Sequence, residues 1–101
     1  MTASDNGATV VVSRGQQIRV VLTGQGTLTW HRPSLAASAP GVLRLLNASG
    51  GYPSRLPARA TYRAALTGTT QIVSITDARC LHAHPPCAFP QRSWQVTIIV
   101  R

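Results

Sequence analysis

Short segments that alternate apolar and polar residues recur along the chain, and turn-forming residues separate them. In "QQIRVVL", Ile18, Val20 and Leu22 fall on one side of an extended segment and Arg19 on the other. A period of two is the pattern of a half-buried strand. Seven strands are predicted on this basis, at residues 8–13, 16–22, 27–31, 42–47, 58–66, 70–77 and 93–101.

The spacing of these segments limits the fold. Short strands every 8–12 residues are typical of all-β sandwiches and barrels. The connections are too short for helices that would cross between parallel strands. Two antiparallel sheets packed face to face therefore bury one side of every strand. Trp30 and Trp94 occupy inward positions and are predicted to lie in the core.

A chain of 101 residues has room for one domain. Residues 8–101 are expected to form that single domain, and residues 1–7 are expected to be a flexible, polar lead-in. The opening "MTASDNGATV" has no charged and apolar leader pattern, so we expect a signal peptide or anchor to precede it in the full-length protein. The sequence holds no apolar run long enough to predict a membrane span.

The charge of the chain is strongly positive. Its ten basic residues are all arginine, only Asp5 and Asp77 are acidic, and the net charge is +8. Such a chain is attracted to anionic surfaces. The arginines stand singly and no RNA-recognition signature is present, so a specific nucleic-acid partner is not expected. Arg59 and Arg63 share the outer side of one predicted strand and form a candidate basic patch, the alternative being an ordinary solvated face.

The segment "CLHAHPPC" holds both cysteines, Cys80 and Cys87. Two cysteines in a small domain favour a disulfide and an oxidising compartment, so the protein is expected to be extracytoplasmic, either secreted or anchored to the cell envelope. For so short a loop, the chain-entropy model gives a stabilisation of about 2–3 kcal/mol.

The same segment also raises a metal hypothesis, because Cys80, His82, His84 and Cys87 are all metal-ligand types. One short loop rarely encloses a metal on four sides, and the spacing matches none of the common zinc patterns. A redox role needs closer cysteines at a helix start. We therefore expect no metal and no cofactor, and metal binding stays as an alternative.

Catalytic groups are scarce. Asp77 is the only acid inside the predicted fold, where it is expected to pair with Arg79 or to accept a turn hydrogen bond. A Ser–His–Asp set can be written with His82 or His84, but nothing marks a nucleophile elbow or an oxyanion hole. The glycines of "SGGYP" are expected to supply positive φ in a turn. The chain is therefore predicted not to be an enzyme.

Two stretches resemble small bacterial immunoglobulin-like domains of actinobacterial type. The opening pattern appears as Gly15, Ile18, Val20, Leu22 and Trp30, and "ALTGTTQIVSITD" with a closing "WQVTIIV" matches their last strands. The resemblance covers residues 9–101. It implies a seven-stranded antiparallel immunoglobulin-like β-sandwich with one disulfide in a secreted or lipid-anchored protein.

A more distant resemblance is to chagasin-type inhibitors of papain-like cysteine proteases, which carry three inhibitory loops at one end of an immunoglobulin-like fold. "TGQGTLTW" stands where their first loop precedes a Trp, and "ASGGYP" stands where their Gly-rich second loop leads to an aromatic strand residue, here Tyr62. The Asn-Pro-Thr-Thr-Gly pattern of the first loop is missing. "RCLHAHPPCAFPQRSW" replaces the Arg-Pro-Trp of the third loop.

Taken together, the sequence predicts a non-enzymatic extracytoplasmic binding or structural module, a monomer that contacts a protein or a cell-envelope polymer through its end loops. The alternatives are a chagasin-like protease inhibitor and a domain that binds metal or an anionic polymer. Gly24 and Gly26 are expected beside the cysteine loop, whereas His31 and Arg32 are expected at the far end of their strand. The candidate binding residues are Leu81, His82, His84, Pro85, Gly24, Gly26, His31 and Arg32.

Overall fold

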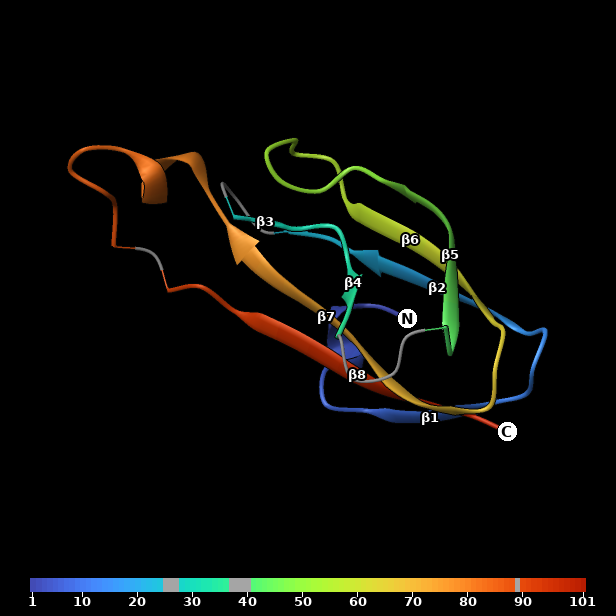
Figure 1. Cartoon of the computed structure of the whole chain (residues 1–101). Coiled ribbons are helices and arrows are strands. Elements are labelled where there is room, and N and C mark those ends of the chain that lie inside the picture. Colours follow the sequence, from blue (N-terminus) through green and yellow to red (C-terminus); the bar gives the residue numbers. More distant parts are fainter. Residues whose placement is uncertain (25–27, 37–40, 89) are drawn as a thin grey trace.

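The computed structural model describes residues 1–24, 28–36, 41–88 and 90–101, and in these ranges the chain is all-β (Figure 1). Two 3-10 helices, η1 (Ala3–Asp5) and η2 (Arg79–His82), accompany the strands. Neither they nor any other helix in the described ranges is long and apolar enough to cross a membrane. The strands are β1 (Thr9–Val12), β2 (Gln17–Leu22), β3 (Thr29–Trp30), β4 (Ser34–Leu35), β5 (Leu43–Ser49), β6 (Ala58–Ala64), β7 (Gly68–Asp77) and β8 (Ser93–Val100).

The strands form two sheets of an immunoglobulin-like β-sandwich. One sheet has the order β1-β8-β7-β3, with β4 also pairing with β7, and the other has the order β2-β6-β5. Each of the seven predicted strands has a counterpart. The sheets face one another across the core, which confirms the predicted fold class.

Two features differ from the predicted seven antiparallel strands. The two-residue strand β4 lies in a stretch predicted to be loop, where Ser34 and Leu35 pair with Val73 and Ile72 of β7. In addition, β1 pairs with β8 in parallel. The turn after β1, with Gly15 at a φ of 90°, leads the chain into β2 on the opposite sheet, so β1 has β8 as its neighbour.

The core is built from the inward positions of the alternating strands. Both tryptophans are buried there, as predicted, and the outward Arg59 and Arg63 of β6 are exposed. Burial of this apolar surface is the main favourable term in folding. The buried inward residues of three strands are Ile18, Val20 and Leu22 of β2, Ala58, Ala60, Tyr62 and Ala64 of β6, and Trp94, Val96, Ile98 and Val100 of β8.

Residues 1–7 lie against both sheets. The backbone N–H of Val21 in β2 donates to the Met1 carbonyl, and the indole N–H of Trp94 in β8 donates to the Thr2 carbonyl at 3.1 Å. The backbone N–H of Gly7 donates to Gln95. In the structure, residues 1–7 thus connect one sheet to the other. The flexibility of this lead-in and the extent of the single domain, residues 8–101, stay predictions.

Candidate functional site

Three connections gather at one end of the sandwich, and we call this region the loop end (Figure 1). They are the described parts of the β2–β3 connection (residues 23–28), the β5–β6 connection (50–57) and the β7–β8 connection (78–92). Strand pairing brings them together, because Leu22 at the end of β2 lies opposite Ala58 and Thr29 of β3 lies opposite Asp77.

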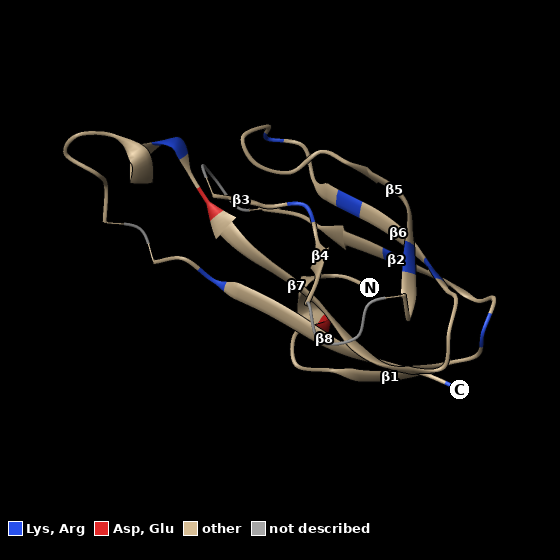
Figure 2. Ribbon diagram, viewed as in Figure 1, with Lys and Arg blue, Asp and Glu red and all other residues tan. Residues whose placement is uncertain are grey.

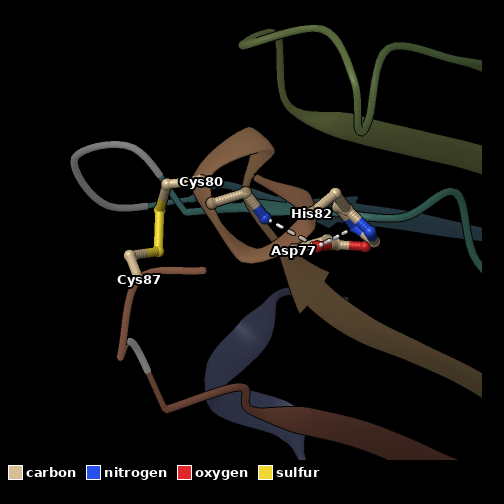
Figure 3. Close-up of a disulfide and its surroundings, with 5 residues drawn as sticks. Asp77, Cys80, His82 and Cys87 are labelled. Carbon is tan, nitrogen blue, oxygen red and sulfur yellow. Dashed lines mark hydrogen bonds and ion pairs between the residues drawn. A yellow bond between two sulfur atoms is a disulfide. The ribbon is translucent and has the colours of Figure 1, made fainter. Parts of the chain in front are cut away.

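The buried carboxylate of Asp77 organises this end. Its side chain is only 8% exposed, and the Nε2 atoms of His31 and His82 lie 2.9 and 2.8 Å from its two oxygens. The backbone N–H of Ala78 also donates to it, at 2.8 Å. Figure 3 shows Asp77 at the end of β7, with His82 reaching it from η2. The carboxylate therefore ties β3 and η2 to the end of β7.

The local register explains this cluster. Thr29 pairs with Asp77, and side chains alternate along a strand. His31, two residues after Thr29, therefore points to the same side of the sheet as Asp77 and is its diagonal neighbour across the two strands. The 3-10 turn of η2 then brings His82 back toward the strand that it has just left. Asp77 takes these histidines as partners in place of the predicted Arg79, while its bond to Ala78 confirms the predicted role as a turn acceptor.

The surroundings of Asp77 act on its pKa in opposite directions. Burial raises the pKa of this carboxyl, because the charged form loses water. The hydrogen bonds from His31, His82 and Ala78 and the nearby charge of His82 lower it, and together they outweigh burial. The pKa of Asp77 is therefore below its ordinary value, and the carboxylate is a stable anionic anchor.

Tyr52 covers the cluster from the β5–β6 connection. Its ring centroid lies 5.0 Å from that of His31 and 5.7 Å from that of His82. The backbone N–H of Tyr52 donates to the Trp30 carbonyl at 2.8 Å, so this connection continues along the edge of β3. The aromatic and backbone contacts together link the β5–β6 connection to β3 and η2.

The two glycines before Tyr52 permit this close approach. Gly50 and Gly51 have φ values of +65° and +78°, which confirms the positive φ predicted for "SGGYP". A Cβ atom at Gly51 would lie 3.0 Å from both the Arg32 nitrogen and the Trp30 oxygen, and one at Gly50 would overlap the Pro57 carbonyl. A side chain at Gly50 would therefore disturb the connection itself, and one at Gly51 would press against the backbone of β3 and Arg32.

The predicted disulfide between Cys80 and Cys87 is present, with its Cα atoms 5.3 Å apart (Figure 3). The backbone N–H of Cys87 donates to the Cys80 carbonyl at 2.9 Å. The bridge closes a loop that contains most of η2 and presents His84, Pro85 and Pro86 to solvent.

A largely apolar hollow of about 620 Å³ lies beside the cluster. Tyr52–Arg55 of the β5–β6 connection form one side, and Ala78–Cys80 with Cys87 form the other. Thr29 completes it. A concave, apolar site between ordered loops is the usual form of a binding site.

The structure brings some of the predicted site residues together and separates others. His82 lies in the cluster, and so does His31, whose predicted position at the far end is wrong because its side chain reaches the Asp77 carboxylate. Arg32 is at the same end, where its Nε donates to the Gly50 carbonyl at 3.0 Å. Gly24 also lies at the loop end, where a Cβ atom would overlap the Leu28 carbonyl, and its place beside the cysteine loop stays a prediction.

The other predicted residues lie outside the Asp77 cluster. Leu81, His84 and Pro85 are on the disulfide loop, with Leu81 half-buried and the other two exposed. Gly26 lies outside the described residues, and Arg59 and Arg63 are on the outer side of β6. Sequence reasoning missed Tyr52, although an aromatic residue directly after a Gly-Gly turn was the available signal.

The catalytic and metal-binding arrangements considered from the sequence are not seen among the described residues of this end. Both cysteines are in the disulfide, so neither offers a thiolate. In the described part of the chain, no serine is hydrogen-bonded to the imidazole of His31 or His82. Across these same ranges no group of three or more candidate ligands is arranged to hold a metal. What the geometry provides is a pair of connections, β5–β6 and β7–β8, that hydrogen bonds, ring contacts and the disulfide hold to the ends of β3 and β7.

Comparison with solved structures finds the same fold in two other proteins. The cysteine protease inhibitor EhICP2 from Entamoeba histolytica superimposes with a TM-score of 0.68 and 16% identity, over 100% of this chain and 92% of that one. Amebosin superimposes with a TM-score of 0.55 and 13% identity, over 100% of this chain and 95% of that one. No family model and no curated protein sequence matches the chain. These likenesses agree with the chagasin resemblance, and nothing among them supports an actinobacterial origin.

Proposed function

We propose that this protein is an inhibitor of papain-family cysteine proteases that acts through the loop end. The observation that carries the proposal is the gathering of three connections at one end of the sandwich, two of which, β5–β6 and β7–β8, are held together through Asp77, Tyr52 and the disulfide. The fold shared with EhICP2, a cysteine protease inhibitor, supports it. The sequence predicted a binding module without a named ligand, and the proposal assigns it papain-family cysteine proteases as its protein partner.

Rigidity is what an inhibitor of this kind needs. A loop that is already held in its bound shape loses little conformational entropy when it enters a protease cleft. At the loop end, a buried carboxylate, two imidazoles, a tyrosine ring and a covalent bridge all restrict the connections. The proposal therefore treats Asp77, His31, His82 and Tyr52 as positioning residues that support the contacting side chains.

The contacting side chains are the exposed ones on these connections. Leu56 of the β5–β6 connection is 67% exposed, which is high for a leucine and suits an apolar protease subsite. His84 and Pro85 extend from the disulfide loop. An edge made of these two connections enters the cleft in the proposed complex, with the hollow between them available to a side chain of the enzyme.

The disulfide supports an extracytoplasmic place of action, because such bonds persist in oxidising compartments. We propose that the protein works there as a non-enzymatic monomer. No metal or other cofactor takes part in the proposed mechanism.

The test is inhibition of papain and two related enzymes by the purified, oxidised protein, with Leu56→Glu as the diagnostic change. We expect tight inhibition by the unaltered chain. The variant should weaken it at least tenfold, which corresponds to about 1.4 kcal/mol, because a charge then enters an apolar subsite.

Leu66→Glu is the matched control. Leu66 is 55% exposed and lies in the β6–β7 turn, at the opposite end of the sandwich from Leu56. The inhibition constant of the Leu66→Glu variant should stay within about twofold of that of the unaltered chain. Absence of inhibition across all the enzymes would rule out the proposed function. Equal losses in both variants would show that the loop end is not the contacting surface.

A further inference from the structure

Five of the ten arginines gather around the outer side of one sheet. Arg19 of β2, Arg44 of β5, and Arg59 and Arg63 of β6 all point outward and are exposed, and we call these four residues the arginine face. Arg14, in the turn before β2, lies at its border. In Figure 2 the blue segments on β2, β6 and β5 lie close together, whereas the red segments lie elsewhere.

The register arranges the arginine face in three cross-strand rows, each with at least one arginine. Rows on the same side of a sheet are separated by two residues along each strand, which is about 7 Å. The four arginines therefore span about 13 Å along β6 and all three strands across. The rows are Gln17–Arg63–Arg44, Arg19–Thr61–Asn47 and Val21–Arg59–Ser49.

These charges are not balanced within the described structure. Arg44 lies directly opposite Arg63, and like charges in that position repel one another. The ion pairs among the described residues are both formed by Asp77, which lies on the other sheet, and Asp5 accepts a hydrogen bond from the Thr2 backbone. An external anion is what would relieve the repulsion.

Next to the repelling pair the surface is hollowed. Arg14, Arg44 and Arg63 line an open hollow of about 490 Å³, together with the small residues Gly15, Ala64 and Ala65. Three guanidinium groups around one depression suit a group with several acceptor oxygens, because guanidinium binds sulfate, phosphate and carboxylate groups through paired hydrogen bonds.

The other residues of the three rows indicate which polyanion fits. Gln17, Thr61, Asn47 and Ser49 stand between the arginines and offer hydrogen bonds to hydroxyl groups. Among the described residues, the aromatic side chains on which bases would stack lie elsewhere: Trp30, Trp94 and Tyr62 are in the core, and Tyr52 is at the loop end. The rows themselves contain one apolar residue, the half-buried Val21, and the exposed Leu45 and Leu46 lie beside them on the edge strand β5, so a membrane partner is tested directly in the experiment below. The disulfide favours an oxidising compartment, and acidic polysaccharides are the linear polyanions that match this surface of arginines and hydrogen-bonding side chains there.

We infer that the arginine face binds an acidic polysaccharide, with an anionic group seated in the hollow of Arg14, Arg44 and Arg63 and the chain running across β6 toward Arg59. This site is on the side of the sandwich and does not depend on the proposed protease inhibition. It would hold the protein on a sulfated or carboxylated polymer while the loop end stays free.

The experiment measures the affinity of the oxidised protein for dextran sulfate at physiological salt, with Arg44→Gln/Arg63→Gln as the test variant. The matched control is Arg79→Gln/Arg92→Gln, which removes two exposed arginines from the β7–β8 connection. We expect at least a tenfold loss of affinity and a shallower salt dependence for the test variant, and less than a threefold loss for the control.

Two results would overturn the inference. Equal losses in the two variants would mean that only net charge matters. Tighter face-dependent binding to polyuridylate or to phosphatidylserine vesicles would mean that the surface serves nucleic acid or membrane instead. Papain inhibition is measured on the same samples: the test variant should retain it, so failure of either proposal is recognised separately.

Discussion

The loop end and the arginine face handle charge in opposite ways. At the loop end, one buried carboxylate is surrounded by two imidazoles and a backbone N–H, at 2.8 to 2.9 Å. On the arginine face, two guanidinium groups lie opposite one another with no acid among the described residues nearby. One region satisfies its charge internally, and the other leaves its charge to solvent or to a ligand.

This difference explains why the two regions suit different partners. A buried charge whose hydrogen bonds are all made within the protein holds the surrounding surface in one shape, which favours a protein partner with a fixed cleft. Unbalanced surface charge gives long-range attraction and strong salt dependence, which favours a flexible polyanion. Substitutions in the two regions should therefore have opposite effects on stability.

The largest expected effect comes from opening the disulfide with Cys80→Ala/Cys87→Ala. Loss of so short a loop closure should lower the free energy of unfolding by about 2–3 kcal/mol. Urea unfolding checks the value. Because the loop end loosens while the arginine face is untouched, papain inhibition should weaken and dextran sulfate binding should not. Equal weakening of both activities would show that the two regions are not independent.

Asp77→Asn removes the charge at the centre of the loop end. At neutral pH we expect a loss of about 2 kcal/mol, because hydrogen bonds to a charged acceptor are lost. The pKa of Asp77 is lowered in the folded protein, so its contribution is present above its ordinary value of 3.8 and disappears as the pH falls through the folded-state pKa. The stability difference between the variant and the unaltered protein should therefore close in acid.

Urea unfolding of both proteins between neutral and strongly acidic pH measures that difference. Asp5→Asn serves as the control, because Asp5 is the other acid and lies in η1, away from the loop end. A difference that stays constant into strong acid would contradict the assigned role of the Asp77 charge.

The sheets were predictable from sequence because strand faces depend on local alternation. The inward sides of β6 and β8 follow directly from the period of two in "ARATYRA" and "SWQVTIIV". The disulfide was predictable for a related reason, since only one pairing exists for two cysteines seven positions apart.

The Asp77 cluster was not predictable, because it depends on pairing between distant segments. His31 and Asp77 are 46 residues apart, and only the β3–β7 register brings them together. The short strand β4 and the parallel β1–β8 pairing likewise follow from the placement of whole strands in the sandwich. The local pattern of "TVVV" is the same for either strand direction.

Tyr62→Phe tests the inner side of the strand that carries Arg59 and Arg63. The buried hydroxyl of Tyr62 donates to the Pro33 carbonyl at 2.9 Å, and its removal should cost about 1 kcal/mol. Burial raises the pKa of Tyr62 to about 12, from 10.0. The contribution of the hydroxyl is therefore complete below pH 10 and is lost as the pH rises toward 12. Unfolding measured across this range should show the gap between the two proteins closing, and a constant gap would contradict the assignment.

The smallest expected effect has the opposite sign. Arg63→Gln removes one member of the repelling pair with Arg44, so the free energy of unfolding should rise by a few tenths of a kcal/mol at low salt. The gain should shrink as salt screens the repulsion. Arg92→Gln, which removes an arginine outside the arginine face, should give no comparable gain. A loss of stability on replacing Arg63 would mean that its guanidinium is balanced within the fold, and the contrast between the two regions would then fail. A gain that disappears when dextran sulfate is added would instead show the polyanion supplying the balance that the fold lacks.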